Sequence, residues 1–216
     1  MTGAAEEPRR RSPLTWAVPV VLVLVAIVGA VVLARDPEEP PPIPTTTTAP
    51  APAPVAVDSD AARYASLDEL VAASDLVVRG RVTDTERGRW FGDGTDSARI
   101  QSRLVTLEVE DVLHGDAPDG AGGTLLVEEE GWTEDGAPLV VDGAAPSADG
   151  DEGIWFLVDP GDDTTDALII VGAQGRYLVD GSHLTGAEGD DPLVAELAAL
   201  TEDELAARVS RTPPRP

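Results

Sequence analysis

The stretch SLDELVAASDLVVRGRV, residues 66–82, contains the two local patterns from which the fold can be predicted. Its first half is typical of a short helix, because Ser66 can cap the N-terminus, Glu69 can reach back to the cap, and apolar residues recur on one face. Its second half alternates apolar and polar residues from Leu76 to Val82, which is typical of a half-buried β-strand. The folded part of the chain is therefore expected to open with a helix followed by a strand.

Short β-patterns fill most of the sequence that follows. Val105, Leu107 and Val109 alternate with polar residues and predict a second strand that ends near His114. Further strands are expected between Gly- and Asp-rich turns, at residues 124–128, 138–141, 154–158, 168–171 and 176–179. Asp180-Gly181 predicts a tight hairpin that joins the last of these to residues 182–185.

Helices are expected again only near the C-terminus. Asp191-Pro192 is a typical helix start, and Thr201 with Glu204 forms a second capping box. Many short strands with helices only at the two ends predict a mainly β domain. An OB-like barrel, closed or partly open, is the favoured architecture, and a small sandwich is the alternative.

The N-terminal region predicts a membrane anchor. Arg9–Arg11 precede an uncharged run in which Leu14–Leu33 covers 20 residues, enough for a helix of about 30 Å. We therefore expect a cytoplasmic basic tail at 1–13, a helix through the lipid bilayer at 14–34, and a C-terminus outside the cytoplasm. A cleaved secretory signal is the alternative, and it also implies export.

Composition sets the remaining boundaries. Residues 35–57 are rich in Pro and Thr and predict a disordered linker. We expect a β-rich extracytoplasmic domain at 58–187, C-terminal helices at 188–210 and a disordered tail at 211–216.

Charge and residue usage exclude several classes of function. Residues 58–216 contain 11 Arg and 35 acidic residues, a net charge of −24. So negative a domain repels phosphate backbones, so nucleic acid is not expected as a partner. The chain has no Cys, so it forms neither disulfides nor thiolate metal sites.

Catalytic and metal-binding patterns are sparse. The chain has two histidines, His114 and His183, and the first of them is expected at a turn. No motif of a known nucleophile, zinc or nucleotide site accompanies them, so no enzyme activity and no cofactor are expected. Asp149, Asp151 and Glu152 are the candidates for a cation site, but their spacing is not that of an EF-hand, and no metal is expected.

The arginines and aromatic residues give the candidates for partner binding. Arg79 and Arg81 lie on one face of their strand and are expected to pair with Glu108 and Glu110 of a neighbouring strand. In contrast, Arg89-Trp90-Phe91 is expected in an exposed loop. Since arginine and aromatic residues are enriched at interfaces, we select as possible partner-binding residues Arg89, Trp90, Phe91 and, after a separate turn, Trp132.

Several segments together resemble a group of exported bacterial domains. They are the stretch at 66–82, VTLEVEDVLHG at 105–115, IWFLV at 154–158 and GAQGRYLVDG at 172–181, in that order. The first two are also similar to the five-stranded OB barrel of the netrin and metalloproteinase-inhibitor group. The resemblance implies a fold and not a function. Metalloproteinase inhibitors approach the protease zinc through an N-terminal Cys, which this chain lacks, so inhibition is not carried over.

The function expected from these patterns is a non-catalytic, monomeric interaction domain. It would be displayed on a stalk outside the cell membrane and bind an envelope protein or a glycan. The alternative is a cell-surface hydrolase or a protease-inhibitor-like module. A third option is a passive structural element of the cell envelope.

Overall fold

The computed structural model describes residues 51–92 and 99–213, which are 43% strand and 16% helix. The predicted mainly β class with a few short helices is confirmed. The predicted basic tail, the span at 14–34 and the first part of the linker lie outside the described residues. Within those residues, no helix has both the length and the apolar character needed to cross a bilayer.

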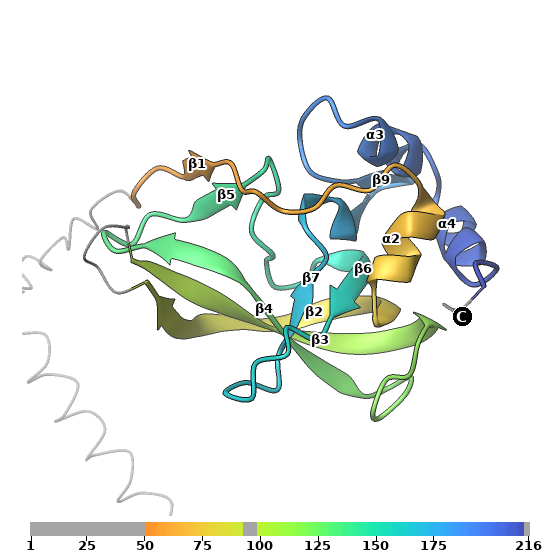
Figure 1. The fold of residues 1–216 in the computed structure, drawn as a ribbon, viewed down its shortest axis with the longest axis horizontal. Coiled ribbons are helices and arrows are strands. Elements are labelled where there is room, and N and C mark those ends of the chain that lie inside the picture. Colours follow the sequence, from red (N-terminus) through yellow and green to blue (C-terminus); the bar gives the residue numbers. More distant parts are fainter. Residues whose placement is uncertain (1–50, 93–98, 214–216) are drawn as a thin grey trace, which may run out of the picture. The chain divides into compact units, whose positions relative to one another are not determined.

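A ring of five strands forms the centre of the fold (Figure 1). In ring order they are β2 (Leu76–Phe91), β3 (Ile100–His114), β4 (Thr124–Thr133), β7 (Leu168–Ile170) and β6 (Glu152–Val158). Pairing is antiparallel except between β4 and β7, which are parallel. Because β6 also pairs with β2, the series of pairings closes on itself.

A hairpin extends the sheet from β6. Strand β8 (Arg176–Asp180) follows the short helix η1 (Ala173–Gly175) and pairs with β6, and β9 (His183–Thr185) pairs with β8. Asp180 lies opposite His183, so the predicted tight hairpin is confirmed. Gly181 has a φ of 64° in the turn, a conformation that glycine adopts without steric cost.

Strand β6 separates two hydrophobic cores. Trp155 and Leu157 belong to the core inside the strand ring, while Ile154 and Phe156 belong to a second core that includes the helices. These four side chains are all at most 1% exposed. A strand buried on both faces reads as a continuous apolar run, which explains why this segment shows no alternation.

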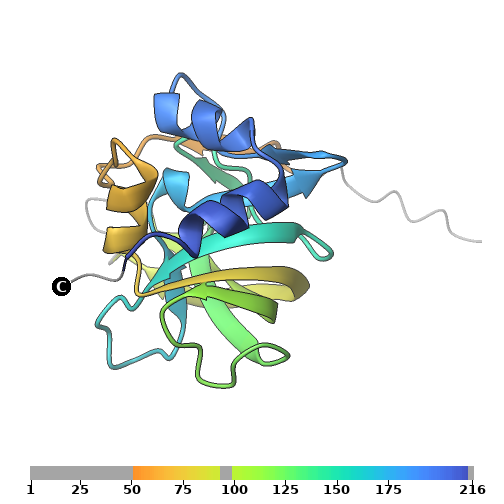
Figure 2. The same ribbon diagram turned by 90° about the vertical axis from the view of Figure 1, so that its right-hand side faces the viewer.

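Three short helices close the second core. They are α2 (Leu67–Ala73), α3 (Pro192–Ala198) and α4 (Glu202–Val209), all on one side of the sheet (Figure 2). Thr201 and Glu204 form the complete capping box that was predicted. Ser66 also caps α2 as predicted, but the Glu69 carboxylate accepts a hydrogen bond from the Ala65 amide and not from Ser66.

Strands β2 and β3 are much longer than the alternating patterns predicted. The prediction for β2 ended at Val82, whereas the strand continues to Phe91. Gly80 and Gly88 do not interrupt it, because each lies where a Cβ atom would collide with β3, at the Glu108 carbonyl and the Ser102 hydroxyl. Four register shifts between the strands accommodate the added length. The expected exposed loop at Arg89–Phe91 is therefore wrong, since these residues form the end of β2.

The folded domain begins earlier in the chain than the predicted end of the linker at residue 57. Residues Val55–Val57, assigned to the disordered linker, form strand β1, which pairs in parallel with β5 (Leu139–Val141) (Figure 1). Asp142 fixes the segment after β1, because its carboxylate accepts hydrogen bonds from the Ser59 amide and hydroxyl. These bonds lower the pKa of Asp142 below its ordinary value. The folded domain thus begins before residue 58.

Candidate ligand-binding cavity

A cavity of about 480 Å³ is lined by the middle of β4 and by β5, among other segments. Its volume is within the range of about 300–1,000 Å³ that is usual for small-ligand sites. Most of the cavity wall is apolar. The apolar part of the wall comes from the ends of β2 and β3, from β5, from β7 and from the loop after β5. The apolar residues include Phe91, Ile100, Leu139, Val141, Ala145, Pro146, Ile169 and Ile170. Segments distant in sequence thus meet around one space.

Arg89 lies at this cavity with all three of its guanidinium nitrogens engaged. Nε and Nη2 donate to the Glu128 carboxylate at 2.8–3.1 Å, and Nη1 donates to Asp162 at 2.6 Å and to the Thr164 hydroxyl at 2.7 Å. Bonds to Glu128 and Asp162 raise the pKa of Arg89. The Thr164 hydroxyl and amide, with Arg89, lower the pKa of Asp162 to about 2. Each of the three nitrogens therefore has an acceptor within the chain itself.

A second, more deeply buried network is centred on Glu129. Its carboxylate accepts hydrogen bonds from Arg176 at 3.1 Å and from the Ser147 amide and hydroxyl at 2.8 and 3.0 Å. Arg103 lies 3.3 Å from the same carboxylate, and burial lowers its pKa. The side chains of all three charged residues are 8–11% exposed. One carboxylate therefore compensates two buried arginines.

The cavity as a whole is acidic and has one carboxylate without a partner. Its wall contains two arginines, Arg89 and Arg176, against four acids, Glu128, Glu129, Glu130 and Asp142, a net charge of −2. In the part of the chain that the structure describes, no side chain bonds to the carboxylate of Glu130, which is exposed. An incoming cation would find this group available, whereas an anion would find both arginines occupied.

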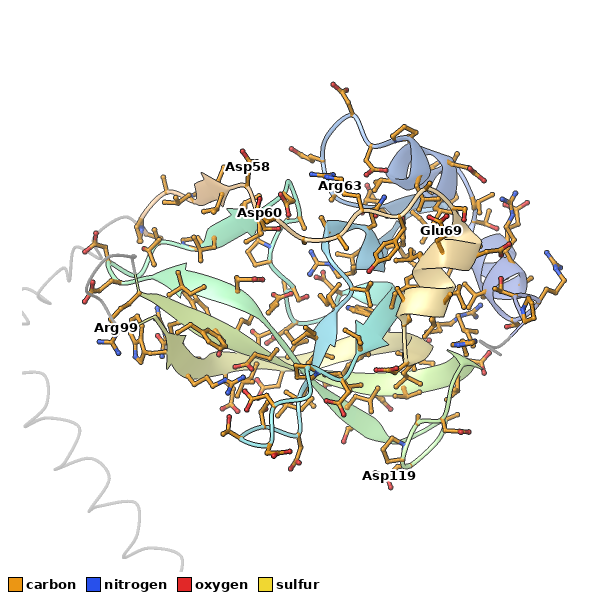
Figure 3. The ribbon with its side chains drawn as sticks, in the orientation of Figure 1. Asp58, Asp60, Arg63, Glu69, Arg99 and Asp119 are labelled. Carbon is orange, nitrogen blue, oxygen red and sulfur yellow. The ribbon has the colours of Figure 1, made fainter. Side chains whose placement is uncertain are left out.

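The structure brings two of the four predicted partner-binding residues to the cavity. Arg89 and Phe91 both line it, and the guanidinium lies 4.8 Å from the phenyl ring centre. Trp90 does not line it. It is 42% exposed and has Arg99 stacked 5.1 Å from its ring, near the end of the sheet where Figure 3 labels Arg99. The two adjacent aromatic side chains thus lie in different environments.

Trp132, the fourth candidate, is also outside the cavity wall. Two guanidinium groups lie over its ring, with Arg87 at 4.4 Å and Arg103 at 4.3 Å from the ring centre. These two cation–π contacts give this residue a structural role, since each such contact stabilises the folded state.

The expected ion pairs of Arg79 and Arg81 are wrong. Arg79 pairs with Glu202 and Asp203 of α4, at 3.6 and 2.9 Å, because that helix packs near β2. Arg81 pairs with Glu152, which lies directly opposite it on β6.

The acidic and histidine candidates are not assembled into a site. Glu152 is occupied by Arg81, and Asp151 accepts a hydrogen bond from the Ala148 amide at 2.9 Å. Across residues 51–92 and 99–213, no three metal-ligating side chains converge. His114 is the last residue of β3 and not a turn residue, and the turn begins at Gly115 with a φ of 76°. His183 opens β9 on the surface.

Sequence analysis did not identify Glu128, Glu129 and Arg176, which contribute most of the charge in the cavity wall. Their partners are 39 and 47 positions away in sequence, so no local spacing relates them. A signal was nevertheless present. Three consecutive acids at 128–130 follow an apolar strand start, and in a strand they must point to both faces, so one face must hold buried charge.

Comparisons with family models, with curated proteins and with solved structures found no match to this chain.

Proposed function

We propose that this chain is a single-pass membrane protein whose outer domain is a non-catalytic binding module. In this proposal residues 14–34 cross the cell membrane, the Pro- and Thr-rich segment is a stalk, and the folded domain lies outside the cytoplasm. The cavity beneath β5 is its ligand site. An envelope protein is the partner class that we favour over a glycan.

The strand order supports an OB-like barrel for this module. Taken in chain order, the five ring strands pair as first, second, third, fifth, fourth and first again, with the third and fifth parallel. A single closed ring favours a barrel over a sandwich of two separate sheets. The resemblance concerns the fold, and the function depends on the cavity.

The observation that carries the binding function is the combination of an apolar wall with charges that are already compensated. Apolar surface that is held open to solvent is characteristic of ligand sites. Arginines and carboxylates that already pair with one another contribute shape and polarity to the cavity. They leave few carboxylates available for proton transfer. Of the four cavity acids, Glu128, Glu129 and Asp142 accept hydrogen bonds from the chain. A glycosidase-type acid–base pair would need two available carboxylates, and this favours binding over glycoside hydrolysis.

The membrane anchor leads to a prediction about topology. Protease added to intact, wall-stripped cells should remove the outer domain by cutting within residues 36–54, while the N-terminal segment stays with the membrane. Immunoblotting with antibodies to each end measures this. A C-terminal domain that is fully protected, or recovery of only a soluble form that begins near Arg35, would contradict the anchor.

The ligand site leads to a second prediction, based on filling the cavity. Ala145 lines it and is exposed, so Ala145→Trp can narrow the cavity with little effect on the core. The full-length chain, used as bait on solubilised cell envelope, should retain a specific partner, and Ala145→Trp should reduce the recovered amount by about tenfold or more. Quantitative mass spectrometry of the retained proteins provides the measurement.

Ala148→Trp is the matched control, since Ala148 is also exposed but does not line the cavity. It should retain the partner at the level of the natural chain. Equal recovery with both variants would remove the cavity from the proposal. Turnover of generic ester, peptide or glycan substrates that Ala145→Trp abolishes would instead support the hydrolase alternative.

A further inference from the structure

We infer that the cavity binds an extended peptide that carries apolar side chains and a basic residue. This inference rests on the proposed function, in which the cavity is the ligand site. Three features of the cavity support it: an unpaired strand edge, a free carboxylate and an apolar wall.

The unpaired edge belongs to β4, which continues well beyond the short strand β7 (Figure 1). On the side away from β3, β4 pairs with β7 only at Val127 and Glu128, and an isolated bridge joins Trp132 to Pro138. Between these points, among the described residues, the backbone of Glu129–Gly131 has β3 as its sole strand partner. A free strand edge recognises other backbones, because it presents unpaired N–H and C=O groups.

The same stretch of β4 forms part of the cavity wall, since Glu129 and Glu130 line it. An extended peptide placed along this edge would direct alternate side chains toward the apolar residues of β5 and β7. A glycan has no regular series of N–H and C=O groups for such pairing and gains less from an aliphatic wall. The combination of edge and wall therefore favours a peptide.

The charges of the cavity favour a positively charged ligand. The wall has a net charge of −2, and both of its arginines already pair with carboxylates of the chain, so it favours a cation over an anion. The Glu130 carboxylate is exposed and has no partner in residues 51–92 and 99–213. Long-range electrostatic attraction also favours a positively charged ligand, because residues 58–216 have a net charge of −24. A lysine or arginine beside the apolar side chains matches these features.

The test uses defined peptides and the full-length chain. The probe is a pool of five fluorescent pentapeptides, blocked at both ends, in which Val and Thr alternate and one Lys occupies a different position in each. Matched pools replace Lys by Gln or by Glu. A fourth pool keeps Lys and carries N-methyl groups on alternate amides, which removes hydrogen-bond donors and leaves the charge unchanged. Fluorescence anisotropy at physiological salt measures binding.

We expect the Lys pool to bind with a dissociation constant below about 1 mM and about tenfold more tightly than the Glu pool. The N-methylated pool should bind about tenfold more weakly, since it cannot pair with β4. Ala145→Trp should abolish binding, and Ala148→Trp should leave it unchanged. Glu130→Gln should reduce the preference for Lys over Gln by about threefold, as expected for an exposed ion pair.

Each contrary result overturns a stated part of the inference. Equal binding of the N-methylated pool excludes pairing with β4, and equal binding of the Glu pool excludes selection for a basic residue. Lys-pool binding that persists in Ala145→Trp is general attraction to an acidic surface and places the peptide outside the cavity. If no pool binds while Ala145→Trp still loses its envelope partner, the peptide inference fails and the binding function stands. If Ala145→Trp retains that partner, the proposed function itself fails.

Discussion

Replacing Glu129 with alanine is expected to lower the free energy of unfolding by about 3–5 kcal/mol. The carboxylate lies between Arg103 and Arg176, whose side chains are 11% and 8% exposed. Its removal leaves two buried positive charges with their nearest carboxylate gone, and uncompensated buried charge is strongly destabilising. Urea unfolding of residues 50–216, followed by tryptophan fluorescence, measures the change.

Glu130→Ala is the control, because Glu130 is the next residue of the same strand and its carboxylate is exposed. This substitution should change the free energy of unfolding by less than about 0.5 kcal/mol. Glu129→Gln should have an intermediate effect, since the amide oxygen still accepts hydrogen bonds from Ser147. If Glu129→Ala and Glu130→Ala have equal effects, the buried network does not stabilise the fold.

The features that sequence analysis predicted well are those determined over a few residues. The Ser66 cap, the Thr201–Glu204 capping box and the hairpin after Asp180 are all present. Each depends on contacts between residues two to four positions apart, so the sequence alone contains the necessary information. The positions of the apolar strand centres were predicted for the same reason, since alternation is a local property.

The features that were missed depend on contacts between distant segments. The alternation of apolar and polar residues stops at Val82, so β2 was expected to end there. It continues to Phe91 because its second half pairs with β3, and at Gly88 a Cβ atom would collide with the Ser102 hydroxyl. Likewise, Arg79 pairs with α4, which lies more than 120 positions away, and no pattern within a strand predicts that.

The candidate site also combines features that local sequence predicts with features that depend on distant segments. Arg89 and Phe91 were selected for their residue type, and both line the cavity. The cavity itself could not be predicted, because it requires β1–β5 to lie across the outer part of β4. Val55–Val57 has a sequence that is compatible with a linker, and it becomes a strand only because β5 offers it an edge. Edge pairing of this kind depends on the partner strand and not on intrinsic propensity.

Phe156→Ala is expected to lower the free energy of unfolding by about 3–5 kcal/mol. The side chain is fully buried and meets Tyr177 edge-to-face, with ring centres 6.1 Å apart. It belongs to the core that joins β6 to the helices, and among the described residues no other Phe or Trp side chain is part of this core. Thermal or urea unfolding of residues 50–216 measures the effect. Trp90→Ala, at an exposed aromatic residue, should change it by less than about 0.5 kcal/mol.

The elements that each substitution destabilises locally show whether β6 separates two cores. Phe156 packs in the core that contains Leu197 and Leu205, whereas its neighbour Trp155 packs inside the strand ring. Amide hydrogen exchange in Phe156→Ala should therefore accelerate most in α3 and α4, and least in β3 and β4. Trp155→Ala should give the opposite distribution. If hydrogen exchange accelerates uniformly in both variants, the two cores open as one cooperative unit. In that case β6 couples the stability of the core on one face to that of the core on the other.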